Sequence, residues 1–377
     1  MRPRPERLER LPEQYFTRLL ARVSAAAALD GEPLVDLGRG NPDVPPPQNV
    51  VAALVEAAAR SDTHGYAPFA GLPALKEAIA ARYRDVYGVH VDPAREVAVL
   101  PGSKTGLIEF AQVTAERGAA VLLPDPGYPD YRSAVALAAA EHVPLPLLED
   151  GRPDWDAARA DAAALYLNYP SNPVAACAPE GVFAEAVEWA SRHGTWVLHD
   201  FAYGDLVFDG RAPQSFLATE GAREVGLELF SMSKSYGMAG WRLGFAVGNA
   251  GLIARLEDLQ NHQFGGIFMP VQTAGVAALT GPQETVHERR ALYEGRRNRV
   301  LAALRGVEAR CEGTFFVWFR LPQGLTCENL LEEHRVAVAP GEGFGARGSG
   351  WARLSLAVPD ERLDTGLARL SEALRRP

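Results

Sequence analysis

The stretch SMSKSYGMAGWRLG, residues 231–244, decides how the rest of the chain is interpreted. It connects two apolar runs, LELFSMS (227–233) and RLGFAVG (242–248), through a turn that contains a lysine, hydroxyl groups, glycines and an arginine. A lysine at a strand end is usually a solvated surface residue, so Lys234 alone indicates little. The two flanking runs nevertheless predict that it lies at the edge of a sheet.

Four more apolar runs precede this stretch and alternate with alanine-rich helical patterns: EVAVLP (96–101), AAVLLPDP (119–126), AALYLNYP (163–170) and TWVLHDF (195–201). The alternation predicts an α/β fold, with a mainly parallel mixed sheet sandwiched by helices. Polar clusters stand where the runs end: PGSK (101–104), DPGYPDY (125–131), NYPSNP (168–173), HDFAY (199–203) and SMSK (231–234). Because ligands bind beyond the carboxyl ends of such strands, we expect the five clusters to converge on one crevice.

The length of 377 residues suits a large domain plus a smaller one. Three consecutive prolines, 45–47, make a stiff break, and a charged helical pattern at 284–305 leads into strand-like segments. We therefore predict an N-terminal segment at 1–44 (an arm plus part of the small domain), a large domain at 45–281 and a small C-terminal α+β domain at 282–377.

Composition excludes several classes of partner. The net charge is −9 and no long basic run occurs, which argues against nucleic acid or an anionic membrane and favours small metabolites. The N-terminus lacks the apolar stretch of roughly ten residues that a signal peptide needs, and no stretch reaches transmembrane length. Three cysteines without a CxxC pair and eight histidines without metal spacing predict a cytoplasmic protein with no disulfide framework and no metal site.

The SxSK motif followed by GWRLG closely resembles the lysine segment of fold-type I pyridoxal 5'-phosphate (PLP) enzymes, specifically the class I and II aminotransferases. The resemblance extends from GRGNPD (38–43) to WARLSLAV (351–358), in a branch related to alanine, aspartate, methionine-salvage and LL-diaminopimelate aminotransferases. It implies PLP as cofactor and Lys234 as the Schiff-base lysine, which also moves the proton at the substrate Cα.

The resemblance also implies how the cofactor ring is held. Asp200 matches the aspartate that keeps the ring nitrogen protonated, and Asn172 and Tyr203 match the residues that hold the phenolic oxygen. Tyr128 matches the aromatic residue that stacks on the ring. The alternatives are structural: Asp200 as a helix cap, Asn172 as a turn former, Tyr203 as a packed aromatic and Tyr128 as a loop anchor.

A small-residue loop, PGSKTGL, opens a helix after a strand and suits a phosphate. By resemblance, Ser103 and the backbone of Lys104 bind the cofactor phosphate there. They are joined by Ser231, Ser233 and Arg242.

Tyr66 in HGYAPFAG resembles the tyrosine that reaches the phosphate of the neighbouring subunit. This implies a homodimer with shared active sites.

Arg353 matches the arginine that binds the substrate α-carboxylate by a two-point contact, with Asn172 and the backbone of Gly40 beside the same group.

The expected reaction is ping-pong transfer of an amino group between an α-amino acid and a 2-oxo acid. A β- or γ-lyase, a synthase or an oxidase on the same fold would reuse these residues, and a PLP-binding sensor without turnover is a further alternative. The identity of the amino donor and acceptor stays open.

Two departures from the family pattern stand out. After Asn172 the family commonly has Pro-Thr-Gly, whereas this chain has Pro173, Val174 and Ala175. Gly265 and Gly266 stand where the family often carries a small polar residue that reaches the partner's phosphate. Either change could alter the grip on the cofactor.

Other segments have weaker signals. Tyr15, Phe16 and QNHQF (260–264) are candidate walls of the side-chain pocket, or ordinary packing. The string GEGFGARGSG (341–350) precedes a strand instead of opening a helix, so it predicts a flexible loop near Arg353 and not a dinucleotide site. His199 is expected to be structural.

Overall fold

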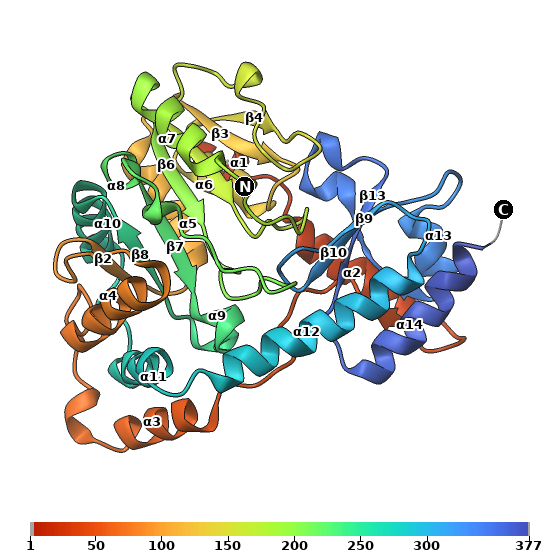
Figure 1. Cartoon of the computed structure of the whole chain (residues 1–377), viewed down its shortest axis with the longest axis horizontal. Coiled ribbons are helices and arrows are strands. Elements are labelled where there is room, and N and C mark those ends of the chain that lie inside the picture. Colours follow the sequence, from red (N-terminus) through yellow and green to blue (C-terminus); the bar gives the residue numbers. More distant parts are fainter. Residues whose placement is uncertain (1–3, 376–377) are drawn as a thin grey trace.

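The computed structural model describes residues 4–375 and is built around a seven-stranded sheet (Figure 1). The strand order is β2-β8-β7-β6-β5-β3-β4, in which β8 runs antiparallel to both of its neighbours and the other pairs are parallel. The predicted mainly parallel mixed sheet is confirmed. The strands are β2 (Val97–Leu100), β3 (Ala120–Asp125), β4 (Glu141–Pro146), β5 (Ala164–Asn168), β6 (Trp196–Asp200), β7 (Gly226–Ser231) and β8 (Gly244–Gly248).

Helices cover both faces of this sheet because successive side chains of each strand point to opposite sides. In β5, Leu165 belongs to one hydrophobic cluster and Tyr166 to another. The first cluster packs against α4 (Pro73–Tyr87), α7 (Val182–His193) and α11 (Met269–Thr280), with α3 (Gln48–Ala58) against α11. The second packs against α5 (Ser103–Thr114), α6 (Asp130–Leu137) and α10 (Ala250–Gln263).

A second, four-stranded antiparallel sheet has the order β12-β13-β10-β9. A third sheet joins the two ends of the chain, because β1 (Val35–Asp36) pairs in parallel with β11 (Val336–Ala337). The long helix α12 connects the α11 end of the molecule to this region (Figure 1). The domain boundaries at residues 45 and 281 stay a prediction. The elements here are β9 (Ala309–Arg310), β10 (Phe316–Arg320), β12 (Ala339–Pro340), β13 (Trp351–Ser355), α2 (Tyr15–Ala27), α12 (Glu284–Ala303), α13 (Cys327–Glu332) and α14 (Asp360–Ala373).

Short helical turns complete the fold. They are α1 (Glu6–Glu9), α8 (Ala222–Val225) and α9 (Met232–Ser235), with 3-10 turns at Ser61–Thr63, Trp155–Ala157, Phe216–Ala218, Ala239–Trp241, Gly341–Phe344 and Ala346–Gly348.

Some predicted strands end or begin elsewhere. The strand expected at 227–233 ends at Ser231, because the Ser231 hydroxyl accepts from the Ser233 N–H at 3.3 Å and caps α9. Lys234 therefore lies on a helical turn. In the strand-like region after the charged helical pattern, β10 begins only at Phe316, after Thr314 adopts a left-handed conformation with φ of 70°. The edge strand β4 was not predicted, because two of its six residues are prolines, which sheets tolerate only at edges.

Candidate active site

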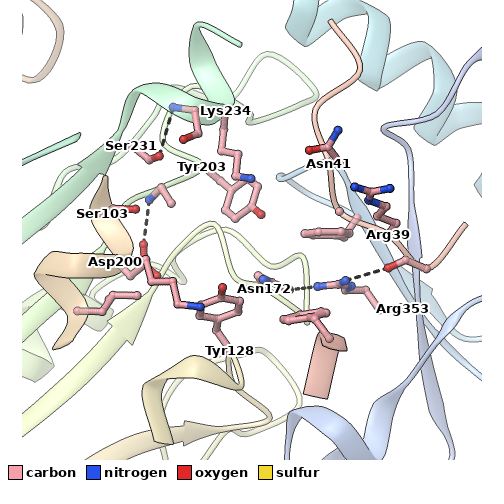
Figure 2. Close-up of a pocket in the computed structure, with 18 of the residues that line it drawn as sticks. Arg39, Asn41, Ser103, Tyr128, Asn172, Asp200, Tyr203, Ser231, Lys234 and Arg353 are labelled. Carbon is pink, nitrogen blue, oxygen red and sulfur yellow. Dashed lines mark hydrogen bonds between the residues drawn. The ribbon is translucent and has the colours of Figure 1, made fainter. Parts of the chain in front are cut away.

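A cavity of about 340 Å³ lies beyond the carboxyl ends of β5, β6 and β7 (Figure 2). The five polar clusters expected from the sequence all contribute to it, so their predicted convergence is observed. Helix α2 and strand β13 close the other sides. Twelve of the thirteen predicted site residues line this cavity: Gly40, Ser103, Lys104, Tyr128, Asn172, Asp200, Tyr203, Ser231, Ser233, Lys234, Arg242 and Arg353.

Lys234 differs from the other lysines of the chain. The sequence contains only three, and Lys76 pairs with Glu257 at 2.6 Å, while Lys104 pairs with Asp130 at 2.7 Å. Lys234 has no such ion pair within residues 4–375, and its Nζ lies 5.9 Å from the ring centre of Tyr203. Burial, with the nearby charges of two arginines, lowers the pKa of Lys234 to about 8. A substantial fraction of this amine is therefore neutral and nucleophilic near pH 7 to 8.

Asp200 ends β6 with both carboxylate oxygens held in place. The Tyr131 hydroxyl donates to Oδ2 at 2.7 Å, and the Ala202 N–H donates to Oδ1 at 3.2 Å. Burial raises the pKa of Asp200, although these two donors oppose the shift. No helix begins directly after Asp200, so the alternative role of helix cap is wrong.

Tyr131 is a site residue that the sequence reasoning missed. It lies three residues after Tyr128 on the first turn of α6, within the quoted cluster DPGYPDY. Its ring centre lies 5.5 Å from that of Tyr128, and its place in the same polar cluster was the signal that could have found it.

Arg353 on β13 is buried without a counter-charge. Its Nη1 donates to Asn172 Oδ1 at 2.7 Å, its Nη2 donates to the Gly38 carbonyl at 3.1 Å, and its Nε has no partner among the described residues. The guanidinium carbon lies 3.7 Å from the ring centre of Phe316. Burial lowers the pKa of Arg353 to about 10, so the group stays cationic near pH 7. A buried cation with only neutral partners fits an anionic ligand.

A cationic cradle forms at the start of α5. Gly102 precedes this helix with φ of 87°, and a Cβ there would collide with the guanidinium of Arg242. Arg242 itself has φ of 57° and donates from Nη1 to the Ala239 carbonyl at 3.0 Å. The Lys104 ammonium pairs with Asp130, so this residue offers its backbone N–H to the cradle. Five basic side chains and one carboxylate line the whole cavity.

The aromatic wall only partly matches the prediction. Tyr128 and Phe16 lie 6.0 Å apart between ring centres, and Phe16 lines the cavity with Leu19 and Leu20 of α2. Tyr15 instead donates its hydroxyl to the Pro340 carbonyl at 2.8 Å and packs away from the cavity. The segment 260–264 is also outside the lining, and its first residue, Gln260, is buried and donates from Nε2 to Glu109 Oε2 at 2.7 Å. Both of these wall predictions are wrong.

Tyr66 is the predicted site residue that lies outside this cavity. Its exposed fraction is 91 %, and a Cβ on Gly265 would lie 3.2 Å from its ring. Gly266 has φ of 90°, a conformation that favours glycine, which accounts for that departure from the family. At the other departure, Ala175 keeps a left-handed φ of 57° although it is not glycine.

His199 is structural, as expected. Its Nδ1 contacts Glu228 Oε2 at 2.7 Å and its Nε2 contacts the Tyr169 carbonyl at 3.0 Å, all in the buried interior.

Within residues 4–375, no helix is long and apolar enough to cross a membrane, and no cluster of three or more His, Cys, Asp or Glu side chains could hold a metal ion.

Comparison with known proteins decides the family. The model of the family described as "Aminotransferase class I and II" matches residues 32–370. The chain belongs to this family. This aminotransferase is 43 % identical over 378 residues to L-glutamine--4-(methylsulfanyl)-2-oxobutanoate aminotransferase of Bacillus subtilis, covering 97 % of the chain and 95 % of that protein. It is 39 % identical to an LL-diaminopimelate aminotransferase of Dehalococcoides mccartyi, covering 97 % of each.

Solved structures agree on the fold. The apo structure of BacF from Bacillus subtilis superposes with a TM-score of 0.94 at 38 % identity, covering 100 % of this chain and 99 % of that one. This aminotransferase therefore has the fold-type I architecture predicted from its sequence. Members of the family depend on PLP, and their substrates are amino acids and 2-oxo acids.

Proposed function

We propose that this aminotransferase binds PLP covalently through Lys234 and moves amino groups between an α-amino acid and a 2-oxo acid by a ping-pong mechanism. One observation carries the proposal: of the three lysines, the only one without an ion pair among the described residues lies half-buried in a cavity with Asp200 and two arginines. Because this amine is desolvated and forms no ion pair with the described residues, it contributes no ion pair to the stability of the fold, and it suits imine formation instead.

The residues present fit the cofactor. The cradle of Ser103, Ser231, Ser233 and Arg242 at the α5 N-terminus suits a phosphate dianion, and the glycine at 102 leaves room for the arginine. When bound, PLP supplies an aldehyde that condenses with amines and a ring that withdraws electrons from the substrate Cα.

Asp200 would lie against the pyridine nitrogen and keep it protonated, because a carboxylate beside a basic nitrogen favours its charged form. Tyr131 and the Ala202 N–H fix the orientation of that carboxylate. The Oδ1 atom of Asn172 is occupied by Arg353, which leaves its Nδ2 group to donate, with the Tyr203 hydroxyl, to the phenolic oxygen. Tyr128 would cover the ring and exclude water.

Arg353 would bind the substrate α-carboxylate, whose charge would neutralise the buried guanidinium. Holding this carboxylate beside Asn172 and the backbone of Gly38 and Gly40 orients the Cα–H bond toward Lys234. The Lys234 amine, with a pKa of about 8, would act as the base that takes the proton from the substrate Cα and holds it at Nζ, and the bound cofactor would supply the electron-withdrawing ring that makes this proton acidic. Proton transfer is favoured over decarboxylation by this orientation.

We also propose a homodimer with shared sites. Tyr66 is exposed at 91 % and lies with Phe69, exposed at 50 %, around Gly265, while Phe268, exposed at 48 %, contacts the ring of His64; these exposed apolar side chains favour burial against a second copy. Light scattering should give twice the chain mass. The variant Tyr66→Ala should retain PLP less tightly even though Tyr66 is outside its own cavity.

The test is to add single amino acids to purified holoprotein and to follow cofactor absorbance and products. Loss of the absorption band of the lysine-bound cofactor, release of the matching 2-oxo acid, and recovery on adding a second 2-oxo acid are expected. Ammonia, pyruvate or peroxide as the principal product would overturn amino transfer in favour of a lyase or an oxidase, and no turnover would favour a sensor. Methionine, glutamine and LL-diaminopimelate are the first substrates to add, because the relatives act on compounds of these types.

A further inference from the structure

The outer part of the cavity carries a basic side chain that none of the proposed roles uses. Arg39 and Asn41 both line the cavity, and neither side chain makes a hydrogen bond or ion pair within residues 4–375. The proposed function assigns Arg242 to phosphate and Arg353 to the α-carboxylate, and Lys104 is paired with Asp130. Arg39 is therefore the cavity cation that is left without an anion.

The backbone that carries Arg39 is held in place. Asp36 Oδ1 accepts from the N–H groups of Gly38 at 2.9 Å and Arg39 at 3.2 Å. The ring of Phe316 fills the space beside Gly40, where a Cβ would lie 2.5 Å from it. The backbone of Arg39 is thus held at a fixed place relative to Arg353, since the Gly38 carbonyl also accepts from Arg353.

Figure 2 shows Arg39 and Asn41 close together, on the side of the cavity away from Asp200 and Ser103. A guanidinium beside a carboxamide offers several N–H donors, which match the two oxygens of a carboxylate.

Apolar residues of the cavity wall distinguish the environment of Arg39 from that of an ordinary solvated arginine. Phe16, Leu19 and Leu20 of α2 line the same cavity, with the ring centre of Phe16 5.3 Å from the guanidinium carbon of Arg353, and they would cover the methylene groups of a substrate side chain. Apolar surroundings lower the local dielectric and strengthen an ion pair formed at their edge.

Resting on the proposed function, we propose that Arg39, assisted by Asn41, is a specificity-determining residue that binds the distal carboxylate of an acidic amino acid substrate. The α-carboxylate binds Arg353, the side chain passes the α2 wall, and its terminal carboxylate reaches Arg39.

The test measures kcat/KM of the half-reaction for glutamate, glutamine and methionine, which have similar length and different end groups. In Arg39→Gln holoenzyme, the value for glutamate should fall about 10- to 100-fold, as expected for loss of a charge-assisted hydrogen bond, and that for methionine should change less than about 3-fold. Arg39→Lys should recover part of the loss. Arg95→Gln is the matched control, because it removes the same charge from an exposed arginine outside the cavity.

Equal losses for glutamate and methionine, or an unchanged value for glutamate, would overturn the inference. A parent enzyme that transaminates methionine but neither glutamate nor aspartate would also overturn it, while leaving the proposed function intact. Release of no 2-oxo acid from any amino acid would overturn the proposed function and this inference with it.

Discussion

Arg82 and Arg353 are both buried, yet the fold treats their charges in opposite ways. Burial opposes the charge of Arg82, but the Asp205 carboxylate, 2.5 Å from its Nη2, and the hydroxyls of Tyr87 and Tyr236 together raise the pKa of Arg82 well above its usual value. Arg353 contacts neutral acceptors and aromatic rings, and burial lowers its pKa to about 10. A charge neutralised within the fold stabilises structure, whereas a buried charge left open is available to a ligand.

The largest expected effect on stability comes from replacing Arg82, the paired arginine of this comparison. Arg82→Met would leave Asp205 buried and unpaired, so the free energy of unfolding should fall by about 3–5 kcal/mol. Urea denaturation of the apoprotein, at one fixed protein concentration, measures this change in the free energy of unfolding. The double variant Arg82→Met/Asp205→Leu should recover most of the loss, and a double variant as unstable as the single one would contradict the assignment.

The same substitution at Arg353 should act on catalysis. Arg353→Met removes the α-carboxylate contact, so kcat/KM should fall by about 10²- to 10³-fold. The free energy of unfolding should stay within about 1 kcal/mol of the parent, because the variant also removes an uncompensated buried charge and keeps apolar contacts with Phe316. A large loss of stability with little loss of kcat/KM would show that the two arginines do not differ as described.

Lys234 extends the comparison of unpaired and paired charges, because its lowered pKa should make the stability of the apoprotein depend on pH. Its folded pKa of about 8 is below the unfolded value of 10.5, so between these values the unfolded chain binds more protons and the stability of the apoprotein rises with pH. Below pH 8 the Lys234 amine is protonated, and its desolvation then lowers the free energy of unfolding by the full amount. Lys234→Met should therefore stabilise the apoprotein by about 1–3 kcal/mol at pH 7, and the gain should shrink toward pH 10.5. A pH-independent gain in urea denaturation would contradict the lowered pKa.

The smallest effect concerns Ala175. Its φ of 57° is a left-handed conformation that L-residues other than glycine adopt at a cost of about 1 kcal/mol. Ala175→Gly should raise the free energy of unfolding by about 0.5 kcal/mol, since the greater freedom of glycine in the unfolded chain offsets part of the relief. Gly313→Ala is a useful contrast, because a Cβ there would lie 2.8 Å from Leu206 and Pro170 and should destabilise the fold.

Much of the fold and the site could be predicted from the sequence, because apolar runs ending in polar clusters specify both a sheet and its ligand edge. Lys234 and Asp200 lie in one cavity for that reason, whereas Arg353, on β13 of the second sheet, was expected there only from the family resemblance. Features set by tertiary contact could not be predicted. The orientation of Asp200 depends on Tyr131 from a neighbouring helix, and the wall around Phe16 depends on α2, whose cap Gln14 bonds to Asp130 at 2.7 Å.

The role of Arg39 also could not be predicted from the sequence, in this case because the side chain lacks a partner within residues 4–375. Its motif, GRGNPD, drew attention to Gly40, but no sequence pattern indicates whether an exposed arginine has a partner. Only the structure reveals that its side chain borders the cavity without one among the described residues.

The most direct test of the central claim is borohydride reduction of the PLP-loaded protein, followed by peptide mass mapping. With three lysines in the chain, the result is unambiguous. The account predicts a pyridoxyl group on Lys234 alone, absent from Lys234→Ala, with Lys76 and Lys104 unmodified because both are held in ion pairs. A pyridoxyl group on Lys76 or Lys104 in the parent protein, with Lys234 unmodified, would contradict it.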